Sequence, residues 1–134
     1  LLTVNGLVAA DHVLVPVQPE YYSLEGLGQL LSTVDLIRQN LKPTLGVLGA
    51  IVTMYDARSR LVGAVLQDLK TNFPAPLFQT TVPRNVRLAE APSYGQPISL
   101  YDPRSRGAQA YEALAAELLT HLDPPPVEPA PVTT

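Results

Sequence analysis

Hydrophobic runs typical of buried strands alternate along the chain with segments of helical periodicity. The run at 13–17 is rich in valine and is closed by Pro16 and Pro19, which predicts a buried parallel strand. The continuous apolar run at 46–54 predicts a central strand, and its glycines indicate close approach of a neighbouring backbone. A third strand is predicted at 77–82.

Helical stripes fill the intervals between these runs. Leucine and valine recur at three- and four-residue spacing from Ser23, a good N-cap, to Leu41, which predicts an amphipathic helix. Similar stripes predict helices at 59–71 and 105–122, and the chain begins within a helix. The alternation predicts an α/β fold, with a parallel sheet, right-handed crossovers and helices on both faces.

Three strands form a narrow sheet with at least one unpaired hydrophobic edge, which natural domains normally cover. Because the chain also starts in mid-element and without methionine, we expect further strands to belong to the same sheet. The isolated chain is therefore expected to self-associate or to unfold in part.

The composition changes abruptly near the C-terminus. Five of the fourteen prolines fall within the last twelve residues. We therefore predict one folded domain at 1–122, followed by a proline-rich disordered tail at 123–134. A role of this tail as a ligand of an SH3 or WW domain stays open.

Composition excludes several classes of site. The chain of 134 residues has no cysteine, so disulfides, thiolate metal sites and cysteine nucleophiles are excluded. His12 and His121 lack the spacing of metal ligands and are interpreted as structural or solvent-facing. Its apolar runs are far shorter than the ~20 residues of a membrane span, which favours a cytoplasmic protein without a membrane partner.

The charge pattern is more informative than the net charge of −3, which by itself argues against a generally basic nucleic-acid-binding protein. Six of the nine basic residues form three close pairs: Arg58 with Arg60, Arg84 with Arg87, and Arg104 with Arg106. If folding gathers these pairs on one face, they form a site for phosphate groups. The alternative is a set of scattered, solvated arginines.

Three ordered segments carry the most specific signal: PVQPEYYSLEGL at 16–27, VTMYDAR at 52–58, and PRNVRLAEAPSYGQPI with YDPRSRGAQAY at 83–111. Together they resemble the ParA/Soj family of chromosome-partitioning ATPases, and the resemblance runs from Leu1 to about Leu122. That family belongs to the deviant-Walker-A P-loop NTPases, with MinD and the nitrogenase iron protein as relatives. The resemblance implies the C-terminal half of a MinD/ParA-like P-loop NTPase fold.

The phosphate-binding motifs of the family precede the position that corresponds to Leu1. No G-x-x-x-x-G-K-[ST] loop occurs among the 134 residues. Such a loop, a helix N-terminus, a lysine and Mg²⁺ hold the triphosphate during phosphoryl transfer. The resemblance thus implies ATP and Mg²⁺ for the full-length protein. For this chain we expect no catalytic residues, no measurable ATP hydrolysis and at best weak nucleotide affinity.

The loop after the third predicted strand is the expected nucleotide site, because ligands of open α/β sheets bind outside the carboxyl ends of the strands. By itself, Pro-Arg-Asn would indicate only a surface turn. The resemblance implies that Pro83, Arg84 and Asn85 contact adenine. Thr53 is a further candidate, since it lies near the end of the neighbouring strand.

The resemblance also implies that an ATP-bound dimer binds double-stranded DNA without sequence preference. The matching arginines are Arg58 and Arg87, whose fixed charge suits phosphate contacts. For Arg58 the alternative is a helix-entry residue paired with Asp56, and Arg104 and Arg106 are weaker DNA candidates.

Glu20 matches a family glutamate at the dimer interface, where it meets the signature lysine of the missing half. The function implied is a chromosome- or plasmid-partitioning ATPase that is nucleoid-associated and works with a ParB-type partner. A MinD-like cell-division ATPase is one alternative. The other is a non-enzymatic interaction domain derived from the ATPase half, and the sequence upstream of Leu1 would distinguish these alternatives.

Overall fold

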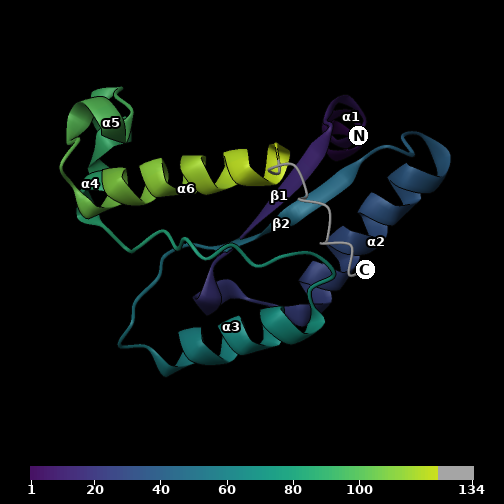
Figure 1. The fold of residues 1–134 in the computed structure, drawn as a ribbon, viewed down its shortest axis with the longest axis horizontal. Helices are drawn as coiled ribbons and strands as arrows, with labels where there is room; N and C mark the ends of the chain where they lie inside the picture. Colours follow the sequence, from purple (N-terminus) through teal and green to yellow (C-terminus); the bar gives the residue numbers. More distant parts are fainter. Residues whose placement is uncertain (124–134) are drawn as a thin grey trace, which may run out of the picture.

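Two parallel strands form the regular sheet of residues 1–123, the part of the chain that the computed structural model describes (Figure 1). β1 (His12–Val17) and β2 (Gly46–Val52) are joined through α2 (Leu24–Asn40). The register pairs His12 with Gly46 and Val17 with Val52, with one shift after Val13. The predicted α/β class and the parallel pairing are therefore confirmed. The tail predicted from 123 onward lies, except for Asp123, outside the described residues.

Helices account for most of the remaining described residues. Ser23 caps α2 by accepting the Gly26 N–H at 3.1 Å, and Ser105 caps the last helix by accepting the Ala108 N–H at 3.1 Å. The remaining elements are α1 (Leu2–Ala9), η1 (Pro19–Tyr21), α3 (Arg60–Asn72), α4 (Val86–Glu90), η2 (Ala91–Tyr94), α5 (Ile98–Tyr101) and α6 (Arg106–Leu122).

Helices cover both faces of the strands, as predicted. On one face, Val15 and Val52 pack with α2 and with Leu69 of α3. On the other face, Ile51 packs with Phe78 and with leucines of α6. Figure 1 shows α6 on one side of the strands, and α2 and α3 on the opposite side. The alternation of buried side chains along β2 thus builds two cores that share one strand.

The prediction of a third strand at 77–82 is wrong. The segment runs parallel to β2, but only one isolated bridge joins the two, Ala50 with Leu77, and a second bridge, Tyr55 with Pro83, lies beyond the ends of both. The Phe78 N–H donates to Ala50, and the next bond to β2 is made by Val82, which donates to Val52. From one bond to the next, the segment therefore advances by four residues, from Phe78 to Val82, while β2 advances by two, from Ala50 to Val52. The extra length forms a bulge, which interrupts the ladder.

Gly49 explains how the segment can approach β2 so closely. Its φ is 156°, and a Cβ at this position would lie 2.4 Å from the Pro76 carbonyl oxygen and 2.9 Å from the Phe78 ring. Only glycine leaves room for both groups. The close backbone approach that the sequence indicated is confirmed at this position.

Residues 83–104, predicted to be a loop, contain α4, η2 and α5. The Asn85 side chain caps α4 by accepting the Arg87 N–H at 2.9 Å. Gly107 lets α6 approach α4, since a Cβ there would lie 2.4 Å from the Leu88 side chain. These short helices lack a periodic stripe long enough to be recognised in the sequence.

Candidate nucleotide and nucleic-acid site

The carboxyl ends of β1 and β2 and the end of segment 77–82 meet at one rim of the molecule. The Thr53 N–H donates to the Val17 carbonyl at 2.9 Å, which extends the β1–β2 ladder by one bond. The Tyr55 N–H donates to Val82, and the Arg84 N–H returns a bond to Tyr55 at 3.2 Å. Thr53 and Pro83 therefore lie at the same rim, and the pairing between their segments is parallel.

All four residues predicted to contact adenine line one pocket at this rim. The pocket has a volume of about 680 Å³, and Thr53, Pro83, Arg84 and Asn85 contribute to its wall. Apolar groups complete the lining, among them Pro16, Val86, Leu88 and Tyr111. A mostly apolar concavity with a few polar groups is typical of a small-molecule site.

Two features of this pocket were not predicted from the sequence. The Asn85 side-chain oxygen is engaged as the cap of α4, so its amide nitrogen is the group left for a ligand. Met54, which also lines the pocket, has a φ of 52°, in the left-handed region that few non-glycine residues adopt. Neither a side-chain cap nor a strained residue produces a periodic signal in a sequence.

Glu20 and Arg84 form an ion pair across the rim. The distance from Arg84 Nη2 to Glu20 Oε1 is 2.7 Å, and the two side chains are about half exposed. Glu20 was predicted at a dimer interface and Arg84 in the adenine pocket, and their meeting was not predicted. Because both side chains are solvated, the pair fixes the direction of Arg84 more than it stabilises the fold.

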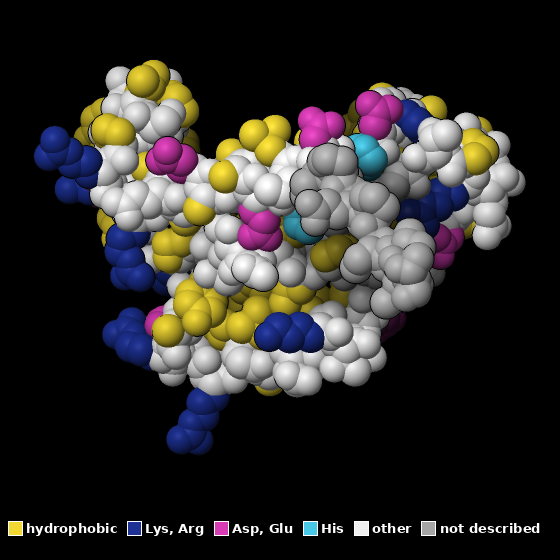
Figure 2. Space-filling view, in the orientation of Figure 1, with side chains coloured by type: hydrophobic (Ala, Val, Ile, Leu, Met, Phe, Trp, Pro, Cys, Tyr) yellow, Lys and Arg dark blue, Asp and Glu magenta, His cyan; other side chains and the backbone are white. Residues whose placement is uncertain are grey.

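A second hollow of about 490 Å³ adjoins the first, and Arg58, Arg84 and Arg106 line it. Figure 2 shows basic side chains gathered along this edge, on the left of the view. The Arg58 side chain is 92% exposed and pairs with Asp56 at 3.1 Å, which is the contact that the alternative interpretation of Arg58 expected. The hydrogen bond from Arg58 lowers the pKa of Asp56, so the carboxylate stays charged.

Arg87 is held by two carboxylates. It lies 3.2 Å from Glu90 and 3.3 Å from Asp102. Tyr101 donates its O–H to Glu90 at 2.7 Å, and this bond, together with Arg87, lowers the pKa of Glu90. Arg87 is thus positioned on α4 by its neighbours while its side chain stays accessible. It does not line the hollow that contains Arg58.

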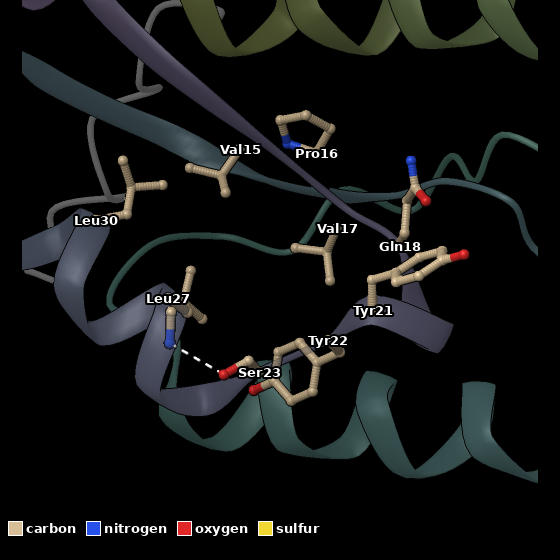
Figure 3. A pocket seen from close by; sticks show the side chains of 10 residues that line it. Val15, Pro16, Val17, Gln18, Tyr21, Tyr22, Ser23, Leu27 and Leu30 are labelled. Carbon is tan, nitrogen blue, oxygen red and sulfur yellow. Dashed lines mark hydrogen bonds between the residues drawn. The ribbon is translucent and has the colours of Figure 1, made fainter. Parts of the chain in front are cut away.

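A smaller pocket of about 210 Å³ lies between the end of β1, η1 and the start of α2 (Figure 3). Apolar side chains such as Val17 and Leu27 line it together with Tyr21, Tyr22 and the capping Ser23. Tyr22 donates its O–H to Asp68 of α3. Burial and this bond to a carboxylate raise the pKa of Tyr22 to about 12. The contact fastens η1 to α3, and no sequence pattern predicted it.

Among residues 1–123, no group of three histidine or acidic side chains could hold a metal ion. The residues 1–123 therefore do not fit Mg²⁺ by themselves. His121 stacks on Phe78 with ring centroids 4.4 Å apart. None of the helices in residues 1–123 is long and apolar enough to pass through a bilayer.

Solved structures of nucleotide-binding proteins share this fold. Cobyrinic acid a,c-diamide synthase from Mycobacterium smegmatis, solved with bound ADP and magnesium, is 35% identical with a TM-score of 0.70, over 90% of this chain and 42% of that one. The cell division ATPase MinD of Pyrococcus furiosus has a TM-score of 0.61 at 22% identity, over 84% of this chain and 44% of its own, and shows the fold alone. The chain thus has the α/β fold of P-loop NTPase relatives.

Sequence comparison narrows this class to one family. A family model described as an AAA domain matches residues 1–47. The sporulation initiation inhibitor protein Soj of Bacillus subtilis is 53% identical over 118 residues, which are 88% of this chain and 47% of the relative. ParA proteins of Myxococcus xanthus and Caulobacter vibrioides match at 50% and 45%. The chain therefore belongs to the ParA/Soj family, and it spans about half the length of these relatives, along their C-terminal portion.

Proposed function

We propose that this chain is the C-terminal part of a chromosome- or plasmid-partitioning ATPase, in which it forms the adenine pocket and part of a DNA-binding surface. The observation that carries the proposal is that Thr53, Pro83, Arg84 and Asn85 line one pocket at the rim of the sheet. The pocket is at the carboxyl ends of parallel strands, where nucleotides bind in open α/β folds. The family, shown by the sequence comparison, supplies the reaction class.

In this pocket the base would lie between apolar walls. The Arg84 stem can pack on one face of the base while Glu20 holds the guanidinium at 2.7 Å. The amide nitrogen of Asn85 is available to donate to a base nitrogen, because the side-chain oxygen caps α4. The phosphates, Mg²⁺ and the hydrolytic step would be served by the motifs that the family carries before the position of Leu1.

Asn85→Asp tests the adenine pocket. Aspartate keeps the oxygen that caps α4 but lacks the amide donor, so the helix is preserved while the hydrogen bond to the base is removed. We expect the affinity for ADP to fall about tenfold with little change in thermal stability. The measurement is an NMR titration of the chain with ADP, with GDP as the control for base preference. Equal ADP affinity in both proteins would contradict the role of Asn85.

The DNA surface is proposed to include Arg58 and Arg87, with Arg106 beside Arg58. Contacts of arginine with phosphates give affinity that depends on salt but not on sequence. In an ATP-bound homodimer both subunits would contribute a copy of each arginine to the DNA-binding surface. Glu20, near the nucleotide rim, would then lie towards the partner subunit. The same role implies a ParB-type partner protein and a location on the nucleoid.

Arg87→Gln tests the DNA surface in the full-length ATPase that the proposal implies. Removing one phosphate contact per subunit should weaken binding to all duplexes alike and reduce the salt slope by about one for each phosphate that is no longer bound. Lys70→Gln, an exposed position on α3, removes the same charge elsewhere and serves as the control. If both variants bind DNA as the unmodified protein does at every salt concentration, Arg87 has no such role.

A further inference from the structure

Glu117 of α6 makes an unusual contact with the segment that leads to the nucleotide loop. One carboxylate oxygen accepts the Gln79 N–H at 2.9 Å, and the other accepts the Thr80 N–H at 2.8 Å. The side chain is only 18% exposed. These two N–H groups belong to the bulge and have no partner in β2. Thr80 is half-buried, so its N–H needs a partner, and the same carboxylate also pairs the N–H of the exposed Gln79.

This contact decides between two registers of the same segment. In an unbroken parallel ladder, Thr80 would follow Phe78 by donating to Val52, but Val82 occupies that carbonyl. Sliding the segment by two residues would restore the regular ladder and would keep the same side chains facing α6. It would also put Thr80 in the buried place of Val82, which is 4% exposed. Burial of Val82 and pairing by Glu117 thus favour the same register.

We propose that Glu117 is a positioning residue that fixes the register of residues 77–82 and thereby places Pro83–Asn85 at the nucleotide pocket. A slip of two residues would move the loop by roughly 6.6 Å, at about 3.3 Å per residue. Pro83 would then lose its pairing with Tyr55, and Asn85 would leave the pocket wall. The register claim stands on the hydrogen bonds and on the burial of Val82, whereas its consequence for nucleotide binding rests on the proposed function.

The carboxylate is the form that makes this contact. Burial by itself raises the pKa of Glu117, but hydrogen bonds from Thr80 and Gln79, together with the charge of His121, outweigh burial and lower it. His121, 3.9 Å from the carboxylate, is the one other titratable group in the lining of the adjacent pocket within residues 1–123. A neutral glutamine cannot replace the carboxylate, because it offers one acceptor and would turn an NH₂ group towards the second N–H.

Glu117→Gln tests the proposal, with Glu112→Gln as the control, since Glu112 is exposed on the same helix. Amide hydrogen exchange of the full 134-residue chain gives the first readout. We expect the exchange of Gln79 and Thr80 to accelerate about tenfold or more, with Val52 and Ile51 unaffected. Unchanged exchange at Gln79 and Thr80 would overturn the proposal.

An ADP titration of the same variants gives the second readout. If Glu117→Gln accelerates exchange and weakens ADP binding about tenfold while Glu112→Gln does neither, the positioning role holds. If exchange accelerates but ADP affinity is unchanged, the positioning role fails, although the register contact is real. If the unmodified chain gives no ADP response at Thr53 or Asn85, the proposed adenine pocket fails, while the exchange result still decides the register claim.

Acid titration of the unmodified chain keeps the test decisive if Glu117→Gln does not fold. The amide proton shifts of Gln79 and Thr80 should follow the titration of Glu117, with a midpoint below the ordinary value of 4.5. Amide shifts that do not follow this carboxyl group would overturn the contact, and with it the proposal.

Discussion

On one side of β2, β1 pairs without interruption from Leu14 to Val17, whereas on the other side residues 76–84 form no continuous ladder and pair only at isolated bridges. The two segments differ in the side-chain contacts that fix the backbone near the rim. After β1, η1 is fastened to α3 by the bond from Tyr22 to Asp68. Within the other segment, Glu117 of α6 holds the bulge itself.

The difference shows that regular pairing and precise placement are separate properties. β1 reaches the rim through backbone bonds, and a side-chain contact then secures η1, the next element. The segment before Pro83 reaches the same rim although it lacks a continuous ladder. Gly49 leaves room for its close approach to β2, and the burial of Val82 and the bonds of Glu117 favour one register. A proposed ligand loop can thus be placed by side chains where the sheet leaves its backbone unpaired.

The largest effect is expected for Gly49→Ala, which breaks the irregular side of β2. The added Cβ would approach the Pro76 oxygen to 2.4 Å, so the segment must move away. We expect a loss of about 2–4 kcal/mol in the free energy of unfolding, measured with urea. Gly63→Ala in α3 is the control, since nothing lies within 4 Å of its Cβ position, and it should stabilise by up to ~1 kcal/mol. Equal stability of Gly49→Ala and the unmodified chain would refute the close approach.

An intermediate effect is expected for Tyr22→Phe, which removes the contact that fastens η1, the element after β1, to α3. Removing the bond to Asp68 should cost about 1–2 kcal/mol at neutral pH. Because folding raises the pKa of Tyr22 from 10.0 to about 12, its contribution is complete below pH 10 and is lost as the pH rises through 12.

The measurement for Tyr22 is the difference in unfolding free energy between the two proteins from pH 8 to 12, within the window that the pKa sets. Tyr21→Phe is the matched control, since Tyr21 is adjacent and 81% exposed, and it should change stability little. A difference that stays constant over this range would show that Tyr22 does not donate to a carboxylate.

The smallest effect is expected for Glu20→Gln, which removes the ion pair between η1, after β1, and Arg84, after the irregular segment. Both side chains are about half exposed, so the loss of stability should stay below ~1 kcal/mol and should shrink as salt is added. Thermal unfolding at low and high salt measures it, with Glu112→Gln as the control. A loss well above ~1 kcal/mol that salt does not reduce would show that this pair is part of the core.

Much of the fold could be predicted because it rests on periodicity. The stripe after Ser23 predicted α2 to within a residue at each end, and the apolar run at 46–54 contains β2. The run at 77–82 misled for a physical reason: its hydrophobic character reflects the burial of Phe78 and Val82, while its N–H groups at Gln79 and Thr80 bond to a distant helix. Hydrophobicity reports burial, not the partner of each backbone group.

The site was predictable only in outline. The resemblance singled out Thr53 and Pro83–Asn85, and the structure places these residues in one pocket. Their contacts with adenine, and those of Arg58 and Arg87 with DNA, stay predictions. The bond between Glu20 and Arg84 spans 64 positions, and those of Glu117 span 37 and 38. Such pairs depend on tertiary placement, which no local pattern encodes.

The left-handed backbone of Met54 has a thermodynamic consequence of its own. This conformation raises the free energy of a non-glycine residue by roughly 1–2 kcal/mol, a cost that glycine does not have. Met54 follows Thr53 in the wall of the pocket, so this strained peptide borders the cavity and not the core. A ligand whose binding lets the Met54 backbone relax would gain this strain energy as binding affinity. The strained backbone would thus favour the ligand-bound state of the pocket.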